Sequence, residues 1–213
     1  MRQAVVLGTG GYCRVILSML AAGCRHDVMT IIELRAPRPG ERIMGALVMP
    51  NPDNLPALCG RDDVDVFLAI GNNDMRKHWW EKVKALGLPM PNLVSPHALV
   101  DESAILGESN VICAGAFVGP QAELGDNNLI NTAAIVEHEV SVGHHCHVAP
   151  SATIAGRSRL DNSCFVGAGA TIVDSVSVAS RTVIGAGATL IRTVDRPGGV
   201  YIGLPAKRRE TGR

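Results

Sequence analysis

The sequence predicts two folded parts: a small parallel α/β domain over residues 1–95, followed by a parallel β-helix over residues 96–193. In residues 98–193 a branched aliphatic residue recurs at every sixth position. Near the N-terminus, a Gly-rich turn joins an apolar segment to a helical pattern. Aromatic residues make up only 3% of the 213 residues, whereas 23 residues are Gly. This composition favours a core of branched aliphatic side chains and tight corners over an ordinary globular core.

The six-residue repeat is the strongest signal in the chain. A short strand with one inward aliphatic side chain, followed by a corner of Gly, Asn, Asp or Ser, is typical of a parallel β-helix. Stacked coils pair their backbones and bury these side chains, and each fully buried one contributes about 1.5–3 kcal/mol against the chain entropy. The third position of the sixteen hexads holds Val100, Leu106, Ile112, Val118, Leu124, Ile130, Val136, Val142, Val148, Ile154, Leu160, Val166, Ile172, Val178, Ile184 and Leu190.

Residues 1–95 alternate between apolar strands and helical patterns, as in a small parallel sheet of four or five strands. We expect Gly- and Pro-rich residues 35–54 to form a loop with a possible short strand at 46–49. The expected strands are 4–7, 29–32, 64–70 and 92–94, and the expected helices are 13–22 and 74–86.

Three strands of this sheet end in residues suited to ligand binding. The ends are Gly8–Tyr12, Glu33 and Gly71–Asn73. Ligands of parallel sheets bind at the carboxyl ends of strands, so we expect a pocket for a nucleotide-like group here. The dinucleotide fingerprint is incomplete, because Cys13 stands where its third Gly belongs. Glu33 either contacts a ribose or base or is a solvated carboxylate.

Charge and cysteine content narrow the functional classes. A formal net charge of zero gives no general attraction to nucleic acid or to an anionic membrane. The six cysteines contain no CxxC pair and suit free thiols in a reducing cytoplasm.

The N-terminus lacks a signal-peptide pattern, and no run of about 18 apolar residues is present, so we expect no membrane span. Residues 194–213 follow the repeat, and we expect them to form a C-terminal capping segment.

The candidate catalytic residues lie in one short stretch. Four of the seven histidines fall between positions 138 and 147, and His138 is followed directly by Glu139. An imidazole suits a general base, and a neighbouring carboxylate can orient it. Two other interpretations remain: solvated corner residues, or a metal site built with nearby Cys and His. Consecutive strand residues point to opposite faces, so few of these side chains can converge on one ion, and we expect no metal.

The segments GTGGY, AIGNNDMRK, NTAAIVEHE, VGHHCHVAP and VYIGLPAKR resemble bacterial sugar-nucleotide acetyltransferases over essentially the whole chain. These enzymes join a Rossmann-like domain to a left-handed β-helix, and the UDP-4-amino-sugar N-acetyltransferase type is the most similar. The resemblance implies a homotrimer with intersubunit active sites and acetyl-CoA as co-substrate. It implies transfer to the 4-amino group of a nucleotide-linked amino-deoxy sugar in bacterial glycan biosynthesis. Sialic-acid O-acetyltransferases share the architecture, so O-acetylation is an alternative.

The resemblance also implies roles for individual residues. His138 takes a proton from the sugar amine, Glu139 tunes this base, and Gly156 offers a backbone N–H to the oxyanion. His147 contacts acetyl-CoA from the facing subunit. The other implied contacts are Ala168 and Ala186 along the CoA groove, Asn131 at the sugar, and Gly10, Gly11, Tyr12, Glu33, Leu34 and Gly71 at the nucleotide sugar.

The sequence departs from the family pattern at the nucleotide site. Tyr12 replaces a usual His, Leu34 replaces an acid, and Glu33 is longer than the usual Asp. The choice among UDP, GDP and dTDP sugars therefore stays open. At the other end, Lys207, Arg208 and Arg209 either meet the CoA phosphates or form a solvated basic tail.

Two further functional classes need separate consideration. A metal lyase resembling the γ-carbonic anhydrases needs histidine ligands spread over several coils. No His occurs between His97 and His138 or after His147, which counts against this class. A non-catalytic scaffold leaves the adjacent His138 and Glu139 unexplained.

Overall fold

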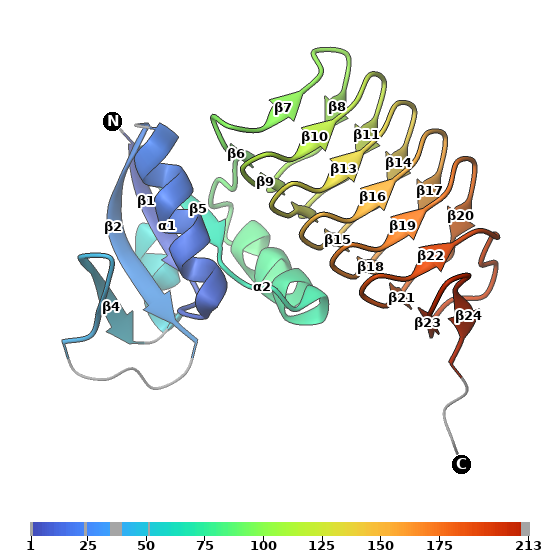
Figure 1. Ribbon diagram of the computed structural model, residues 1–213. Coiled ribbons are helices and arrows are strands. Elements are labelled where there is room, and N and C mark those ends of the chain that lie inside the picture. Colours follow the sequence, from blue (N-terminus) through green and yellow to red (C-terminus); the bar gives the residue numbers. More distant parts are fainter. Residues whose placement is uncertain (1, 24, 35–39, 51, 210–213) are drawn as a thin grey trace. The chain divides into compact units, whose positions relative to one another are not determined.

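The computed structural model describes residues 2–23, 25–34, 40–50 and 52–209, and the chain forms two compact units, Met1–Pro96 and His97–Arg213 (Figure 1). The C-terminal segment that begins at residue 194 belongs to the second unit. Cys24, residues 35–39 of the expected loop and residues 210–213 of the expected cap lie outside the described residues.

The first unit contains a five-stranded sheet in the order β3-β4-β2-β1-β5. The central strand β1 (Arg2–Leu7) pairs in parallel with β2 (His26–Glu33) on one side and β5 (Val64–Leu68) on the other. The next strand, β4 (Ala46–Pro50), is parallel to β2. The carboxyl end of β1 is therefore a topological switch point. The chain passes from β1 to β2 on one side of it and later crosses to β5 on the other side.

The edge of this sheet differs from the prediction. A two-residue strand, β3 (Arg42–Ile43), forms an antiparallel hairpin with β4 through Met44 and Gly45, both at positive φ. Such a short strand leaves no periodic pattern in the sequence from which it could be predicted. The expected last strand exists as β6 (Leu93–Val94) but lies outside this sheet. A 3₁₀ helix, η1 (Pro52–Leu58), begins within the expected loop of residues 35–54 and extends beyond it.

Two helices of thirteen residues each complete the first unit: α1 (Gly11–Gly23) and α2 (Asn73–Ala85). The side chain of Asn72 caps α2 by accepting a hydrogen bond from the Met75 N–H at 2.9 Å. Gly87, at positive φ, donates to the Lys84 carbonyl and ends the helix. Among the described residues, no helix has both the length and the apolarity to cross a bilayer.

One carboxylate is buried at the edge of the sheet where the parallel strands begin, away from their carboxyl ends. Asp65 of β5 is only 4% exposed. Its Oδ2 accepts from Arg2 Nε at 2.6 Å and lies 2.7 Å from His26 Nε2. The two side chains come from the starts of β1 and β2, so this cluster ties the three central strands together.

The second unit is a parallel β-helix with three flat faces. Strands three apart in sequence lie one above the other, so one coil spans eighteen residues (Figure 1). We name the faces by their middle strands: the β13 face, the β14 face and the β15 face. The strands are β7 (Leu99–Val100), β8 (Ile105–Leu106), β9 (Val111–Ile112), β10 (Phe117–Val118), β11 (Glu123–Leu124), β12 (Leu129–Ile130), β13 (Ile135–Val136), β14 (Ser141–Val142), β15 (His147–Val148), β16 (Thr153–Ile154), β17 (Arg159–Leu160), β18 (Phe165–Val166), β19 (Thr171–Ile172), β20 (Ser177–Val178), β21 (Thr182–Ile184) and β22 (Thr189–Leu190).

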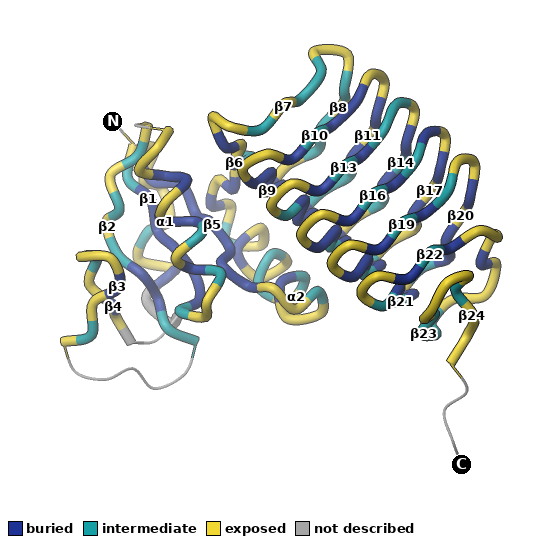
Figure 2. The backbone as a smooth tube through the Cα atoms, viewed as in Figure 1, coloured by how far each residue is buried: buried dark blue, intermediate teal, exposed yellow. Residues whose placement is uncertain are grey.

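The predicted inner column forms the core of this helix. Fourteen of the sixteen third-position aliphatics are buried, whereas Val100 and Leu106 of the first coil are partly buried and pack against the rest. Figure 2 shows the buried positions recurring along every coil. The hydrophobic pattern therefore sets the coil, as expected.

The corners have an unexpected regularity. The sixth residue of fourteen successive hexads, from Ser109 to Gly187, has a positive φ, and eleven of these residues are not Gly. They include Glu139, Arg157 and Arg181, so the residue types at this corner position are more varied than the expected Gly, Asn, Asp or Ser. Backbone pairing holds most of them there: from Asn127 to Gly187, each sixth-position N–H donates to the fifth-position carbonyl one coil earlier, as Arg157 does to His138 at 3.0 Å.

The C-terminal segment extends the β15 face. Its strand β23 (Gly199–Ile202) pairs in parallel with β21, and β24 (Lys207–Arg208) pairs with β23 in antiparallel fashion. Tyr201 and Ala206 pack against the core of the helix. Lys207 and Arg208, which we considered as part of a solvated tail, are exposed but belong to a strand.

Candidate active site

The adjacent His138 and Glu139 lie on the corner that leads from the β13 face to the β14 face. His138 Nδ1 is 3.0 Å from Glu139 Oε2, and the two side chains are 44% and 51% exposed. The carboxylate accepts a hydrogen bond when Nδ1 carries the proton, and this tautomer leaves Nε2 as a free acceptor. The ring is therefore accessible and oriented, as a general base requires.

The other edge of the His138 ring lies over Gly156, one coil further along. A Cβ built at Gly156 would be 2.6 Å from both Cε1 and Nε2 of His138, so only Gly leaves room for the ring. The Gly156 carbonyl accepts from Ser175 N–H at 2.9 Å, while its own N–H donates to no group among the described residues. A free donor therefore lies close to the imidazole.

Two of the residues expected to meet CoA, Ala168 and Ala186, lie on a different corner, which leads from the β15 face to the β13 face. Ala168 and Ala186 occupy the same corner position in successive coils. Their N–H groups also donate to no group in the described part of the chain. Small side chains leave this row of amides accessible to a ligand that carries hydrogen-bond acceptors.

Asn131 and His147 are in contact near that corner. Asn131 Nδ2 is 3.3 Å from His147 Nε2, and its Oδ1 accepts from the Thr132 N–H at 2.8 Å. His147 packs edge-on against Phe165, with ring centroids 5.0 Å apart. One chain thus groups Asn131 with His147 and groups His138 with Glu139 and Gly156, but it keeps the two groups on different corners of the helix.

A second candidate site lies at the switch point of the first unit. Gly10, Glu33, Leu34 and Gly71 line one pocket of about 400 Å³, which the carboxyl ends of β1, β2 and β5 surround. Glu33 accepts a hydrogen bond from the Thr9 hydroxyl at its edge. A Cβ at Gly10 would meet no atom within 4 Å, so the space above this turn is open.

The switch-point pocket also differs from the expected set. Gly11 and Tyr12 lie in the first turn of α1, outside the lining residues. Thr9, Asn72 and Met75 line the pocket but were not among the expected contacts. Thr9 and Asn72 lie within the motifs GTGGY and GNN, and Met75 lies two residues after GNN, so these motifs were the available signal.

A groove of about 540 Å³ runs beside the corner that carries Glu139. Its lining includes Glu139 and Arg157, together with Glu123 and Arg159 from the β14 face. Sequence reasoning missed Arg157, although it occupies the same hexad position as Glu139, one coil later. Within the described residues, no three His, Cys, Asp or Glu side chains are grouped as metal ligands would be.

Comparison with known proteins covers both units. Residues 3–83 match the PglD N-terminal domain family. A mutant of perosamine N-acetyltransferase from Caulobacter crescentus, solved with CoA and GDP-perosamine, is 30% identical with a TM-score of 0.90. The match covers 98% of this chain and 97% of that one.

A second solved structure gives the same result. The acetyltransferase domain of PglB from Neisseria gonorrhoeae, in complex with acetyl coenzyme A, is 32% identical with a TM-score of 0.90, over 98% of this chain and 99% of that one. WeeI from Acinetobacter baumannii shares the fold at 17% identity, with a TM-score of 0.75 and coverage of 98% and 100%.

Proposed function

The chain belongs to the PglD-type family of acetyl-CoA-dependent sugar-nucleotide acetyltransferases, and from this premise we propose that it acetylates the 4-amino group of a nucleotide-linked amino-deoxy sugar. The observation that carries the proposal is the accessible His138 ring, which lies between the Glu139 carboxylate and Gly156. Of the three solved structures described above, two contain CoA or acetyl-CoA, and one of these also contains a GDP-linked sugar.

The proposed chemistry is a direct transfer. The neutral amine attacks the thioester carbonyl, so a C–N bond forms, and His138 Nε2 takes the proton that the amine loses. The Gly156 N–H stabilises the oxyanion. The C–S bond then breaks, and the leaving thiolate takes the proton back from His138. Holding both substrates in one site supplies much of the rate, and the base adds typically about 10²–10⁴-fold.

The proposed assembly is a homotrimer with sites between subunits. It is supported by the placement of His138 and Gly156 on one corner and of His147, Ala168 and Ala186 near another. A thioester that contacts both groups needs corners from two chains. Mass photometry measures the assembly state. A monomer that kept its catalytic activity would contradict this assembly.

We further propose that the pocket at Gly10, Glu33, Leu34 and Gly71 holds the nucleotide part of the substrate. Its support is the position at the switch point and the open space above Gly10.

A cytoplasmic location is also proposed, and it is supported by five free cysteines among the described residues.

The proposal is tested by thiol release from acetyl-CoA against UDP-, GDP- and dTDP-linked 4-amino-4,6-dideoxy sugars and free sialic acid. We expect turnover of one nucleotide-linked amino sugar and an amide in the product by mass spectrometry. An ester product, or turnover of sialic acid alone, would instead support O-acetylation. His138→Ala should lower kcat by about 10²–10⁴-fold with the fold intact, and unchanged turnover would contradict the role of His138.

A further inference from the structure

Arg76, near the start of α2, is a buried cation that the proposed chemistry does not use. The residue is only 2% exposed. Its guanidinium donates from Nη1 to the carbonyls of Ile70 and Gly71, both at 3.3 Å, and from Nη2 to Asn73 Oδ1 at 3.0 Å. A buried charge is costly unless it is hydrogen-bonded, and these bonds converge on a single turn of the chain.

The turn that Arg76 holds forms one wall of the switch-point pocket. Ile70, Gly71 and Asn72 line this pocket of about 400 Å³, whereas Arg76 lies outside the lining residues. The backbone N–H of Arg76 also donates to the Asn72 carbonyl at 2.9 Å. Arg76 therefore binds three successive carbonyls, those of residues 70–72, from behind the wall of the pocket.

The bound carbonyls also set the direction of the next backbone amides. The peptide bonds of this turn are trans, and in a planar trans peptide the C=O and the N–H point in opposite directions. The Gly71 carbonyl is directed to Arg76, so the Asn72 N–H is directed away from Arg76. This N–H donates to no group in the described part of the chain. A hydrogen-bond donor is therefore held at the pocket wall.

The strand order places this donor across the pocket from a carboxylate. Strand β2 ends at Glu33 and β5 leads into the turn of residues 70–73, and the two strands lie on opposite sides of β1. Both Glu33 and Asn72 line the pocket. A ligand's anionic group is repelled by the carboxylate and attracted by an amide donor in front of a buried cation. The diphosphate of a nucleotide therefore suits the Asn72 side of the pocket.

We propose that Arg76 is a positioning residue for the nucleotide sugar: it holds the turn of residues 70–73 so that the Asn72 N–H meets the diphosphate. This inference rests on the proposed nucleotide pocket and adds to it a residue that does not touch the ligand. A positioning role predicts a larger loss of affinity for the nucleoside diphosphate than for the nucleoside when Arg76 is replaced. A merely structural role predicts that both affinities fall by the same factor, or that neither falls.

The test is isothermal calorimetry of the full-length protein with GDP, UDP and dTDP and with the matching nucleosides. Arg76→Met should weaken the diphosphate that wild type binds by about tenfold or more, and the nucleoside by no more than about threefold. Arg76→Lys keeps the charge but loses the planar fork that reaches several acceptors, so it should still weaken the diphosphate several-fold. If Arg76→Met does not fold, Arg76→Lys decides the question.

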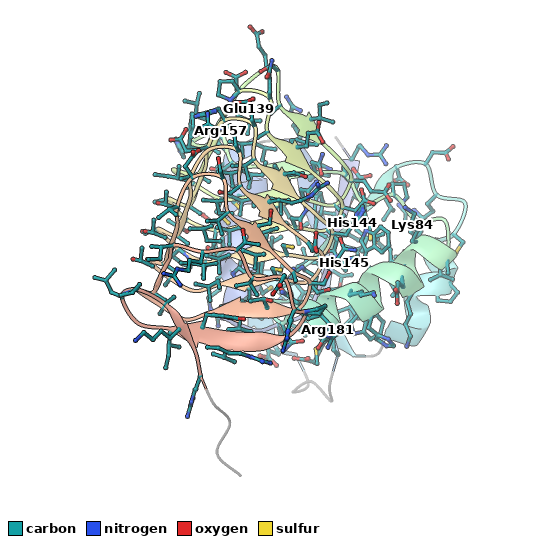
Figure 3. All side chains as sticks on the ribbon, turned by 90° about the vertical axis from the view of Figure 1, so that its right-hand side faces the viewer. Lys84, Glu139, His144, His145, Arg157 and Arg181 are labelled. Atoms are coloured by element: carbon teal, nitrogen blue, oxygen red, sulfur yellow. The ribbon has the colours of Figure 1, made fainter. Side chains whose placement is uncertain are left out.

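Two control variants separate this effect from a loss of stability and from a loss of charge. Arg2→Met removes two hydrogen bonds to Asp65 at the edge of the same sheet where the strands begin. It should lower the thermal midpoint and leave the nucleotide affinity unchanged. Lys84→Met removes an exposed cation near the other end of α2, whose Nζ lies 4.4 Å from the centroid of the Trp80 ring. Figure 3 shows Lys84 on this helix, and its loss should leave the diphosphate affinity at the wild-type level.

The outcomes distinguish this inference from the proposed function. Wild-type affinity for the diphosphate in Arg76→Met, or equal losses for diphosphate and nucleoside, overturns the inference and leaves the acetyl transfer standing. A selective loss of diphosphate affinity in a protein that releases no thiol from acetyl-CoA supports the inference and rejects the transfer. A wild-type protein that binds none of the three diphosphates rejects the nucleotide pocket and this inference with it. With activity present, KM for the nucleotide sugar should rise in Arg76→Met with little change in kcat.

Discussion

The imidazole of His138 lies so close to Gly156 that a Cβ at residue 156 would be 2.6 Å from both Cε1 and Nε2. We therefore expect Gly156→Ala to turn the ring away from its position and to lower kcat by about 10²-fold, as a misplacement of about 1 Å does. Steady-state kinetics on the folded protein measure this effect. Gly143→Ala is the matched control, because its Cβ would lie 2.5 Å from Asn162 Oδ1 at another corner, and it should spare kcat.

Gly10 offers a test of the nucleotide pocket that leaves the fold intact. A side chain at residue 10 meets no protein atom within 4 Å, so Gly10→Val should change the thermal midpoint little. It fills space that we assign to the ligand, so KM for the nucleotide sugar should rise about tenfold or more, with little change in kcat. Isothermal calorimetry with the nucleotide alone checks this result, and wild-type affinity would place the nucleotide elsewhere.

Asp65 makes stability depend on pH. Burial raises its pKa, but the hydrogen bonds from Arg2 and His26 outweigh this effect and hold the pKa below the usual value. The stabilisation is therefore complete above the unfolded pKa of about 3.9 and is lost as the pH falls through the lower folded value. Asp65→Asn should cost roughly 1–3 kcal/mol of unfolding free energy at pH 7.

Urea unfolding at several pH values measures this difference. The gap between wild type and Asp65→Asn should narrow below about pH 4, because Asp65 becomes protonated in the unfolded chain there, and it should close once the pH falls below the lower pKa of folded Asp65. A gap that stays constant down to pH 2 would mean that the charge of Asp65 does not stabilise the sheet.

The cysteines of the first unit should differ in reactivity. Burial raises the pKa of the Cys13 thiol to about 11, whereas Cys59 is exposed. Since the thiolate is the reactive form, iodoacetamide at pH 7.5 should label Cys59 well before Cys13. Peptide mapping by mass spectrometry gives both rates, and equal labelling of native protein would show that α1 opens readily.

The fold was largely predictable because its main determinant is local. One inward aliphatic every six residues is enough to define the coils. The apolar segment 4–7 and the mostly apolar segment 64–70 predicted two strands of the sheet. The hairpin strand Arg42–Ile43 was missed, because its two residues show no pattern. The left-handed corners at Glu139 and Arg157 were also unexpected, since their φ values depend on pairing with adjacent coils.

The candidate site was predictable only in part. The repeat places His138 and Gly156 one coil apart, and the structure brings them together at the same corner. Arg157 carries no motif of its own, and its place beside the site appears only in the structure, where its backbone N–H donates to the His138 carbonyl and its side chain donates to Asp174. Asn131 and His147 are sixteen residues apart in sequence. Their contact depends on how the chain turns from the β15 face into the corner that carries Asn131.

The eighteen-residue coil limits how such a chain can change length in evolution. Removing one hexad between His138 and Gly156 would move every later side chain onto the next face and separate these two residues, although each remaining hexad would still have its aliphatic residue. Removing three hexads outside the catalytic corner would shorten the helix and keep all later residues on their faces. Viable insertions and deletions in this domain should therefore come in multiples of eighteen residues, with shorter ones confined to the corners.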